Sequence, residues 1–254
     1  NSELYDDIKD FAKNNQLEIK RHQTKNTFIY IDRPSKLLAS KYFTSGLLTV
    51  QNPINDLIVD LLNPNFNEVV IDSCASPGGK TASIADRLSK SGKIYAYDIN
   101  KSEIFINTMK RLNISNYRFS IKDSSNCKLS VADKAICDVP CSGTGTLAKR
   151  SDLRWRLKLS NIYEHQENQV KILNNVSKSL KNGGVLIYST CSIEKEENWD
   201  VVDKFLLSNN KFKLEDAAKF IDPRFVDNLG ALNVLPGYYD MDGGFAVRMV
   251  KNSG

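Results

Sequence analysis

Two cysteines, Cys141 and Cys191, stand where the sequence allows thiol chemistry. Cys141 lies in the polar, glycine-rich stretch 138–146 (DVPCSGTGT), and Cys191 lies in the stretch 189–192 (STCS). Each stretch directly follows an apolar run typical of a buried strand, so two parallel strands would bring both thiols to one crevice. A thiolate is a strong nucleophile, and a thiol can donate or accept a proton. A lone buried cysteine is most often inert packing, but a pair at ligand-facing strand ends indicates covalent chemistry.

A second stretch with ligand-binding character is 72–81 (DSCASPGGKT), which follows a short apolar run. Gly78 and Gly79 would let a ligand approach the backbone, and the N-terminus of the next helix offers free N–H groups to a carboxylate or phosphate. A phosphate-binding loop of the form GxxxxGK[ST] would need glycine at position 74, where Cys74 stands, and no GxGxxG motif is present. Nucleoside triphosphates and dinucleotides therefore lose support, and a smaller nucleoside ligand remains.

Two aspartates, Asp98 and Asp123, close the next two apolar runs. An acid at such a strand end can accept hydrogen bonds from ribose hydroxyls. A single aspartate there is more often a helix cap or a solvated turn residue. Three successive strand ends that supply glycines, Asp98 and Asp123 favour a ligand site.

These residues must be positioned by an alternation of strands and helices, which predicts a parallel sheet wrapped by helices in an α/β fold. The predicted strands are 68–71, 94–97, 117–121, 134–137, 185–188 and 245–250. The predicted helices are 53–62, one starting at 80, 102–112, 161–180 and 194–207, with Asn52 and Pro53 as N-cap and first residue of the first.

The first 49 residues have a different pattern. A helix over 2–14 and short strands over 17–20 and 27–31 predict a small α/β subdomain, residues 1–49, before a catalytic domain, residues 50–254. Its basic residues could face an RNA backbone, although a solvated charged surface is the simpler interpretation of each one. These residues are Lys20, Arg21, Lys25 and Arg33.

The composition sets outer limits on the class of protein. The 254 residues are 41% hydrophobic and 26% charged with a net charge of +5, which fits a globular protein and permits a polyanionic partner. Because no apolar run reaches the about 18 residues of a membrane span, we expect no membrane segment. An odd set of five cysteines indicates reduced thiols and a cytoplasmic location, and their spacing with two histidines predicts no metal site. We expect a monomer, and because the first residue is not methionine, an upstream domain could be missing.

Taken together and in order, the motifs CASPGGKT, DVPCSGTG and STCS closely resemble the Sun (Fmu) family of S-adenosylmethionine-dependent RNA cytosine-5 methyltransferases. The resemblance runs from about Gly46 to Phe245 and is greatest to the bacterial 16S rRNA enzymes. Ser151 and Gly244 depart from it, since the family commonly has proline and phenylalanine there, and this puts the identity of the RNA in doubt. Further family elements are Asp152, Trp155, Gln169, Glu197 and Asn198.

The resemblance implies a Rossmann-like class I methyltransferase fold, with a mostly parallel sheet and an antiparallel last strand. It implies that Cys191 is the nucleophile, that Cys141 helps to release the product, and that Asp138 belongs to the catalytic site. The cofactor would be S-adenosyl-L-methionine, held by Cys74, Ala75, Ser76, Pro77, Gly78, Gly79, Lys80, Asp98, Asp123 and Asp138.

The implied chemistry has a physical reason. Carbon 5 of cytosine is too weak a nucleophile to accept a methyl group unaided, so a thiolate must first add to carbon 6. The base must leave any stack to reach the thiols, so the RNA would be single-stranded or flipped there. Lys149, Arg150 and Arg154 would suit its phosphates, and Trp155 would either stack on a base or pack in the interior.

Three alternatives remain open at this point. The substrate could be transfer RNA instead of ribosomal RNA, or the chain could be a non-catalytic RNA-binding assembly factor. A DNA cytosine-5 methyltransferase would use Cys141 as the nucleophile. The second thiol and the absence of a Glu-Asn-Val triplet argue against that class.

Overall fold

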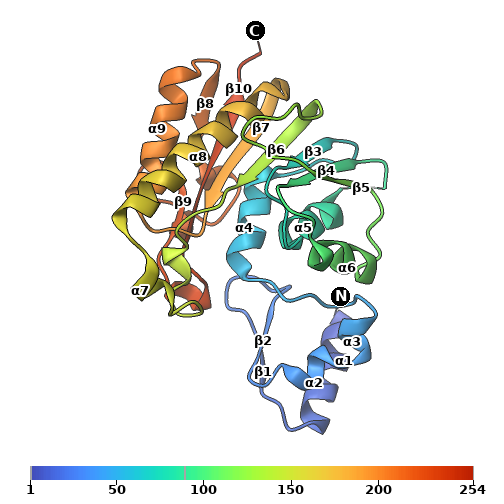
Figure 1. The fold of residues 1–254 in the computed structure, drawn as a ribbon. Coiled ribbons are helices and arrows are strands. Elements are labelled where there is room, and N and C mark those ends of the chain that lie inside the picture. Colours follow the sequence, from blue (N-terminus) through green and yellow to red (C-terminus); the bar gives the residue numbers. More distant parts are fainter. Residues whose placement is uncertain (1, 89, 254) are drawn as a thin grey trace.

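The N-terminal part of the chain forms a small unit beside a larger domain (Figure 1). The computed structural model describes residues 2–88 and 90–253. The two strands predicted in the small unit are present, each shorter than expected, and they pair as an antiparallel hairpin. Its elements are α1 (Ser2–Asn14), β1 (Ile19–Arg21), β2 (Ile29–Ile31), α2 (Ser35–Leu38) and α3 (Lys41–Thr44).

The larger domain is built around one mixed sheet with the strand order β5-β4-β3-β6-β7-β10-β8. Strands β5, β4, β3, β6 and β7 are parallel to one another, whereas β10 runs antiparallel to β7, β8 and β9. The predicted parallel sheet with an antiparallel last strand is confirmed. The strands are β3 (Val69–Asp72), β4 (Lys93–Asp98), β5 (Tyr117–Ile121), β6 (Ala132–Asp138), β7 (Leu180–Thr190), β8 (Phe212–Glu215), β9 (Leu232–Val234) and β10 (Gly244–Lys251). The α-helices are α4 (Pro53–Leu62), α5 (Gly79–Arg87), α6 (Glu103–Arg111), α7 (Leu153–Arg156), α8 (Leu159–Lys178) and α9 (Trp199–Ser208).

Helices cover both faces of the sheet because successive strand residues point to opposite sides. Val70 and Ile187 belong to the apolar cluster with the buried side chains of α4 and α5. Their chain neighbours Ile71 and Tyr188 belong to the cluster with α8 and α9. Figure 1 shows α8 and α9 on one face, with α4, α5 and α6 on the other. The carboxyl ends of the parallel strands therefore remain free for a site.

Helix α4 begins as its sequence predicts. The Asn52 side chain accepts a hydrogen bond from the backbone N–H of Ile54 at 3.2 Å, and Pro53 occupies the first turn. The helix ends at Asn63, which has a left-handed backbone with φ of 46°. This helix joins the small unit to the sheet and carries Asn55 toward the candidate site.

The single continuous helix predicted over 194–207 is wrong, because the structure has two separate elements there. The chain instead forms a short 3-10 turn, Lys195–Glu197, and α9 begins only at Trp199. Asn198 lies between them with non-helical angles, φ −109° and ψ −99°. Its side chain accepts from Thr190 Oγ1 at 2.6 Å and donates to the Ser192 carbonyl at 3.0 Å. These tertiary bonds outweigh the helical pattern.

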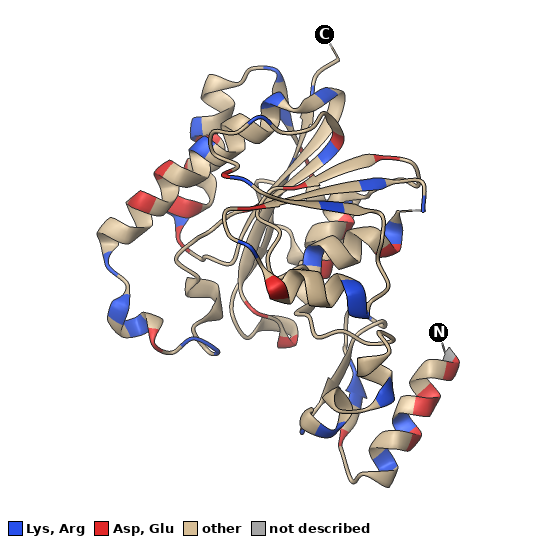
Figure 2. Cartoon of the chain, turned by 45° about the vertical axis from the view of Figure 1, so that its right-hand side comes forward, with Lys and Arg blue, Asp and Glu red and all other residues tan. Residues whose placement is uncertain are grey.

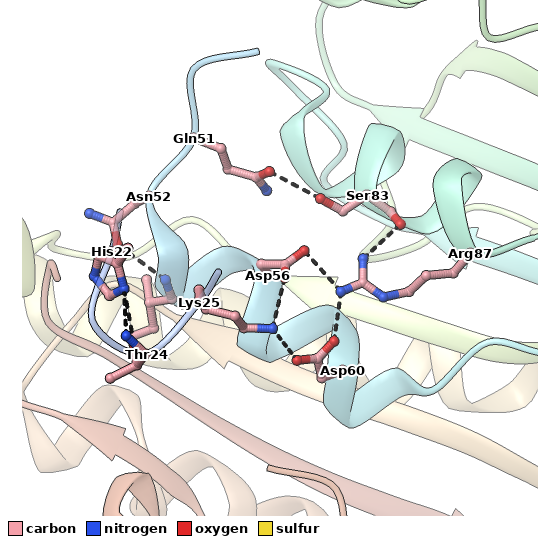
Figure 3. A network of polar contacts seen from close by, with 10 residues as sticks. His22, Thr24, Lys25, Gln51, Asn52, Asp56, Asp60, Ser83 and Arg87 are labelled. Carbon is pink, nitrogen blue, oxygen red and sulfur yellow. Dashed lines mark hydrogen bonds and ion pairs between the residues drawn. The ribbon is translucent and has the colours of Figure 1, made fainter. Parts of the chain in front are cut away.

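A charge cluster joins the small unit to the larger domain (Figure 3). Lys25, from the loop of the hairpin, contacts Asp56 at 2.8 Å and also Asp60, both on α4. Arg87 of α5 contacts the same two carboxylates at 2.9 and 2.6 Å. Two cations thus share two anions, which fixes the hairpin against α4.

Candidate active site

The two thiols meet at the carboxyl edge of the sheet. Cys141 follows β6 and Cys191 follows β7, and these strands are parallel neighbours. Their Sγ atoms lie 3.2 Å apart, with Cys191 exposed and Cys141 half-buried. The convergence that the sequence predicts is therefore present.

The surroundings of the two thiols shift their pKa values in opposite directions. The hydrogen bond with Cys141 lowers the pKa of Cys191, against the opposing effect of burial. The same bond, together with burial and the charge of Glu197, holds the pKa of Cys141 well above its usual value. The two directions favour Cys191 over Cys141 as the sulfur that ionises.

A buried acid fixes the loop that carries Cys141. Glu197 is fully buried, and its carboxylate accepts hydrogen bonds from the Ser142 N–H at 2.8 Å and from the Ser142 hydroxyl. Gln169 donates both to Glu197, at 3.1 Å, and to the Pro140 carbonyl at 3.0 Å. Because a buried charge must be hydrogen-bonded, this network defines one conformation of the loop.

The sequence contained a signal for this network that the site prediction did not use. The buried positions of α8 include 162, 166, 169, 173 and 176, the spacing of a core-facing stripe. Two of them, Gln166 and Gln169, are polar. A polar side chain on such a stripe needs a buried partner, and Glu197 is the partner of Gln169.

A second set of contacts ties the two thiol loops together. The Ser192 hydroxyl lies 3.1 Å from that of Ser142 and 3.2 Å from that of Thr144. The Gly145 N–H donates to the Cys191 carbonyl at 2.9 Å. A Cβ at position 145 would lie 2.7 Å from that same oxygen, so only glycine permits this approach.

Asp138, at the end of β6, lies in a polar cluster beside the thiol loops. Lys80 donates to Asp138 Oδ2 at 2.6 Å and to Asn55 at 2.8 Å. The Ser189 hydroxyl donates to Asp138 Oδ1 at 2.8 Å. Lys80 and Asp138, predicted separately from the sequence, are thus direct partners.

The glycine-rich loop lies next to Asp98, as predicted. The Ser76 N–H donates to Asp98 Oδ2 at 3.0 Å. Gly78 adopts φ of +106°, and a Cβ there would lie 3.1 Å from Phe105 and Met109 of α6. The loop can therefore pass closely over α6 only with glycine at this position.

Asp123 and Cys74 differ from the other predicted cofactor residues in their exposure or pKa. Asp123 is exposed, and hydrogen bonds from Ser125 hold its pKa below the usual value. This geometry fits the solvated-turn alternative. Neither Asp123 nor Asp98 is among the residues that line the cavity at this edge of the sheet. Burial holds the pKa of the Cys74 thiol well above its ordinary value, so this third cysteine stays protonated.

A cavity of about 580 Å³ opens between the loop 74–80 and the N-terminal hairpin, with Asp138 in its wall. Several buried polar atoms in its lining have no hydrogen-bond partner among the described residues: Asp72 Oδ1, Ser76 Oγ, Gln51 Nε2 and His22 Nε2. Because such atoms are costly to leave unpaired, they indicate a ligand that carries both donors and acceptors. A nucleoside with an amino-acid end meets that requirement at Asp72, Ser76 and Gln51.

Asp72 is a site residue that the sequence-based list omitted. It ends β3, as Asp98 ends β4, so the same strand-end argument applied to it. It is 1% exposed, and burial raises its pKa to about 6 despite a 2.6 Å hydrogen bond from Thr81. Its other oxygen is free for a ligand.

The three predicted RNA-binding residues, Lys149, Arg150 and Arg154, are all exposed. Lys149 pairs with Asp242 at 2.7 Å. Trp155 on α7 is 90% exposed, so the interior-packing alternative for it is wrong. Figure 2 shows basic segments both around α7 and on the N-terminal unit.

Two classes of feature are absent from residues 2–88 and 90–253. No helix there combines the length and the apolar character that crossing a bilayer requires. Nor do three or more His, Cys, Asp or Glu side chains in those ranges gather in a way that could hold a metal ion.

Solved structures share this architecture over nearly the whole chain. The crystal structure of PH0851 matches 97% of this chain and 56% of its own with a TM-score of 0.90 and 31% identity. The structure of NSun6 from Pyrococcus horikoshii with SFG matches 85% of this chain and 56% of its own, with a TM-score of 0.76 and 30% identity.

Curated relatives carry one recurrent description. The probable ribosomal RNA small subunit methyltransferase B of Synechocystis is 32% identical over 82% of this chain and 49% of its own length. The corresponding protein of Bacillus subtilis is 28% identical over 85% of this chain and 50% of its own. The chain thus spans about half the length of the curated relatives it matches.

The family comparison covers the part of the chain that holds both thiols, the glycine-rich loop and strands β3 to β9. A model of one family, described as 16S rRNA methyltransferase RsmB/F, matches residues 59–250, which include both thiol loops and the strand ends that line the cavity. This chain therefore belongs to the RsmB/F family of methyltransferases.

Proposed function

We propose that this chain transfers a methyl group to carbon 5 of a cytosine in RNA, with Cys191 as the covalent nucleophile. One observation carries the proposal: the two sulfurs lie 3.2 Å apart, within hydrogen-bond distance of each other. A nucleophile needs its thiolate stabilised, and a releasing group needs a proton to exchange. The lowered pKa of Cys191, which the hydrogen bond with Cys141 produces, and the raised pKa of Cys141 agree with those two roles.

The cofactor in this proposal is S-adenosyl-L-methionine, which supplies an electrophilic methyl group when bound. The family description supports this choice, as does the structural neighbour solved with SFG, an analogue of that cofactor. Asp98 would accept hydrogen bonds from the ribose, and the loop 74–80 would lie along the nucleoside. Asp72 and Gln51 would bind the charged amino-acid end, because they offer the free acceptor and the free donor.

In the proposed reaction, the Cys191 thiolate adds to carbon 6 and breaks the C5–C6 double bond, so carbon 5 becomes nucleophilic and accepts the methyl group. A base then removes the proton from carbon 5. The electron pair re-forms the double bond and expels the Cys191 sulfur, a step that Cys141 assists by proton transfer. Asp138, held by Lys80 and Ser189, would accept a hydrogen bond from the amino group of the cytosine.

Small-subunit ribosomal RNA is the proposed substrate. The names of the curated relatives support it, and so does the exposed basic segment with Lys149, Arg150 and Arg154. We assign residues 1–49 to RNA binding and residues 50–254 to catalysis. We further propose that the chain acts as a monomer in the cytoplasm, where ribosomal RNA is found.

Covalent trapping on RNA that contains 5-fluorocytosine tests the thiol assignment. Fluorine at carbon 5 blocks the final elimination, so the wild-type chain should remain bound to the RNA. Cys191→Ala should abolish this adduct, whereas Cys141→Ala should accumulate an adduct even on ordinary cytosine RNA. Gel mobility under denaturing conditions measures both.

Cys127→Ala is the matched control, since Cys127 is a free, half-buried thiol between β5 and β6, outside both thiol loops, and it should behave as wild type. Adduct formation that survives in Cys191→Ala but is lost in Cys141→Ala would reverse the roles and support the DNA-type alternative.

A further inference from the structure

One wall of the cavity comes from the N-terminal hairpin, which the methyl-transfer chemistry does not use. The hairpin contributes Lys20, His22, Phe28, Ile29 and Tyr30 to the lining. The opposite wall includes Lys80 and Asp138, beside the thiol loops. A molecule that fills this space therefore contacts the hairpin together with Lys80 and Asp138, which lie beside the thiol loops.

His22 is the buried polar residue of this wall. It is 8% exposed, and its Nδ1 accepts a hydrogen bond from the Thr24 backbone N–H at 3.3 Å, with the Thr24 hydroxyl at 3.0 Å. Figure 3 shows the ring turned with this nitrogen toward Thr24. A backbone N–H can only donate, so the proton of the neutral ring lies on Nε2.

The Nε2–H of His22 has no acceptor among the described residues, although it is buried. Leaving such a donor unpaired costs about 1–3 kcal/mol. The ring thus presents a fixed, neutral hydrogen-bond donor in the wall of the cavity. Its partner must be an acceptor.

The charges around the cavity favour an uncharged partner. Each lysine of the lining is already paired with an aspartate: Lys20 with Asp240 at 3.6 Å, Lys80 with Asp138 at 2.6 Å and Lys149 with Asp242 at 2.7 Å. A phosphate would have to compete with these carboxylates. A neutral acceptor meets no such competition.

The hairpin also supplies aromatic surface. Phe28 is half-buried, Tyr30 is 56% exposed, and the Lys20 ammonium lies 5.2 Å from the centre of the Tyr30 ring. Aromatic side chains bind nucleobases by stacking, with little dependence on their sequence. A planar ring with a carbonyl or ring-nitrogen acceptor fits both the aromatic residues and the His22 donor.

We infer that the hairpin wall is a subsite for the base of a nucleotide adjacent to the target cytosine, with His22 Nε2 as the donor that selects it. This inference rests on the proposed function, because it takes the RNA strand through the same cavity. The geometry that carries it is the continuity of the lining from His22 to Asp138.

Sequence selection by His22 can be measured directly. Transcripts of small-subunit ribosomal RNA are prepared with the nucleotides on either side of the methylated cytosine randomised, and methylated molecules are sequenced after bisulfite treatment. The wild-type chain should prefer one class of base about tenfold at one flanking position. His22→Phe, which keeps an aromatic ring but loses the donor, should reduce this preference to within about twofold and raise the KM for RNA about tenfold, the cost of one hydrogen bond.

Three comparisons distinguish the loss of the His22 hydrogen bond from a general loss of the folded chain. His22→Gln retains an N–H donor and should keep part of the preference. His165→Phe alters the other histidine, on α8 and outside the cavity lining, and should match wild type. The KM for S-adenosylmethionine should stay unchanged in His22→Phe. An unchanged flanking preference in His22→Phe would overturn the inference.

A second measurement does not depend on catalysis. With only two histidines, 15N-labelled chain should give two imidazole spin systems, and His22→Phe assigns them. Single-stranded RNA should shift the Nε2–H signal of His22 and leave that of His165 in place. If no methylation or adduct is found but this shift occurs, the proposed function fails and the subsite stands. No shift with RNA, or an equal shift with inorganic phosphate, would refute the base subsite.

Discussion

At the scale of single residues, Asp72 shows a conflict between stability and ligand binding. Its pKa is about 6 in the folded chain against an ordinary 3.8, because burial disfavours the charged form. The unfolded chain therefore releases this proton at lower pH, and folding loses stability as the pH rises from about 4 to 6. At 1.36 kcal/mol per pKa unit, the loss amounts to about 3 kcal/mol at neutral pH.

Asp72→Asn, which has no charge to bury, should accordingly raise the free energy of unfolding at pH 7.5 by up to about 3 kcal/mol. The gain should shrink below pH 6 and vanish below pH 4. Urea denaturation across this range measures it, and calorimetry should show weaker cofactor binding. A variant less stable than wild type at every pH would contradict this account.

The residue scale also shows what the sequence could supply. Cys141, Cys191 and Asp98 were predictable because each follows an apolar run, and strand ends of a parallel sheet share one edge. The unpartnered state of Asp72 Oδ1 and His22 Nε2 was not predictable, since it depends on which groups the folded chain brings near them. The sequence identifies candidates, and packing decides which atoms remain free.

At the scale of elements, Glu197 connects the turn before α9 to the loop after β6. Glu197→Ala would leave the Ser142 N–H and the Gln169 amide without their buried acceptor. Each unpaired group costs about 1–3 kcal/mol, so the free energy of unfolding should fall by about 3 kcal/mol. Glu197→Gln keeps an acceptor and should lose less than half of that. Thermal or urea denaturation gives both values.

The neighbouring Glu196→Ala provides the matched control, because the Glu196 side chain is only half-buried, and it should change stability by less than about 0.5 kcal/mol. The decay of the adduct on ordinary cytosine RNA adds a functional readout, since a loosened Cys141 loop should slow release. Equal stability of the three variants would mean that the buried network does not hold the loop.

Local signals predicted some elements well and others poorly. The start of α4 was predicted because Asn52 and Pro53 form a local cap. The break before α9 was missed because Asn198 is fixed by Thr190 and Ser192, which belong to another segment. Strands β8 and β9 were missed too, since both are short and exist through pairing with β10. Non-local pairing leaves little trace in a single sequence.

At the scale of the whole molecule, the cavity exists because two units face each other. The sheet supplies Asp72, Asp138 and the glycine-rich loop, and the hairpin supplies the opposing wall. The sequence predicted both units from their patterns but not their relative position. That position depends on contacts between Lys25 and carboxylates more than 30 residues away in the chain.

The charge cluster at this junction should therefore control how firmly the hairpin is held. Burial opposes the ionisation of Asp56, but hydrogen bonding and charge from Lys25 and Arg87 outweigh it and lower its pKa. Lys25→Met keeps the apolar stem and removes the charge, while Arg87 still neutralises part of the pair, so we expect a cost of about 1–2 kcal/mol. Hydrogen exchange over residues 17–31 should accelerate about tenfold, which corresponds to 1.4 kcal/mol, with no change in β3 to β7. Lys20→Met in the same hairpin removes an exposed pair with Asp240 and should have little effect. Faster exchange across the whole sheet in Lys25→Met would show instead that the two units unfold as one, because loss of a local clamp can loosen only the segment that it holds.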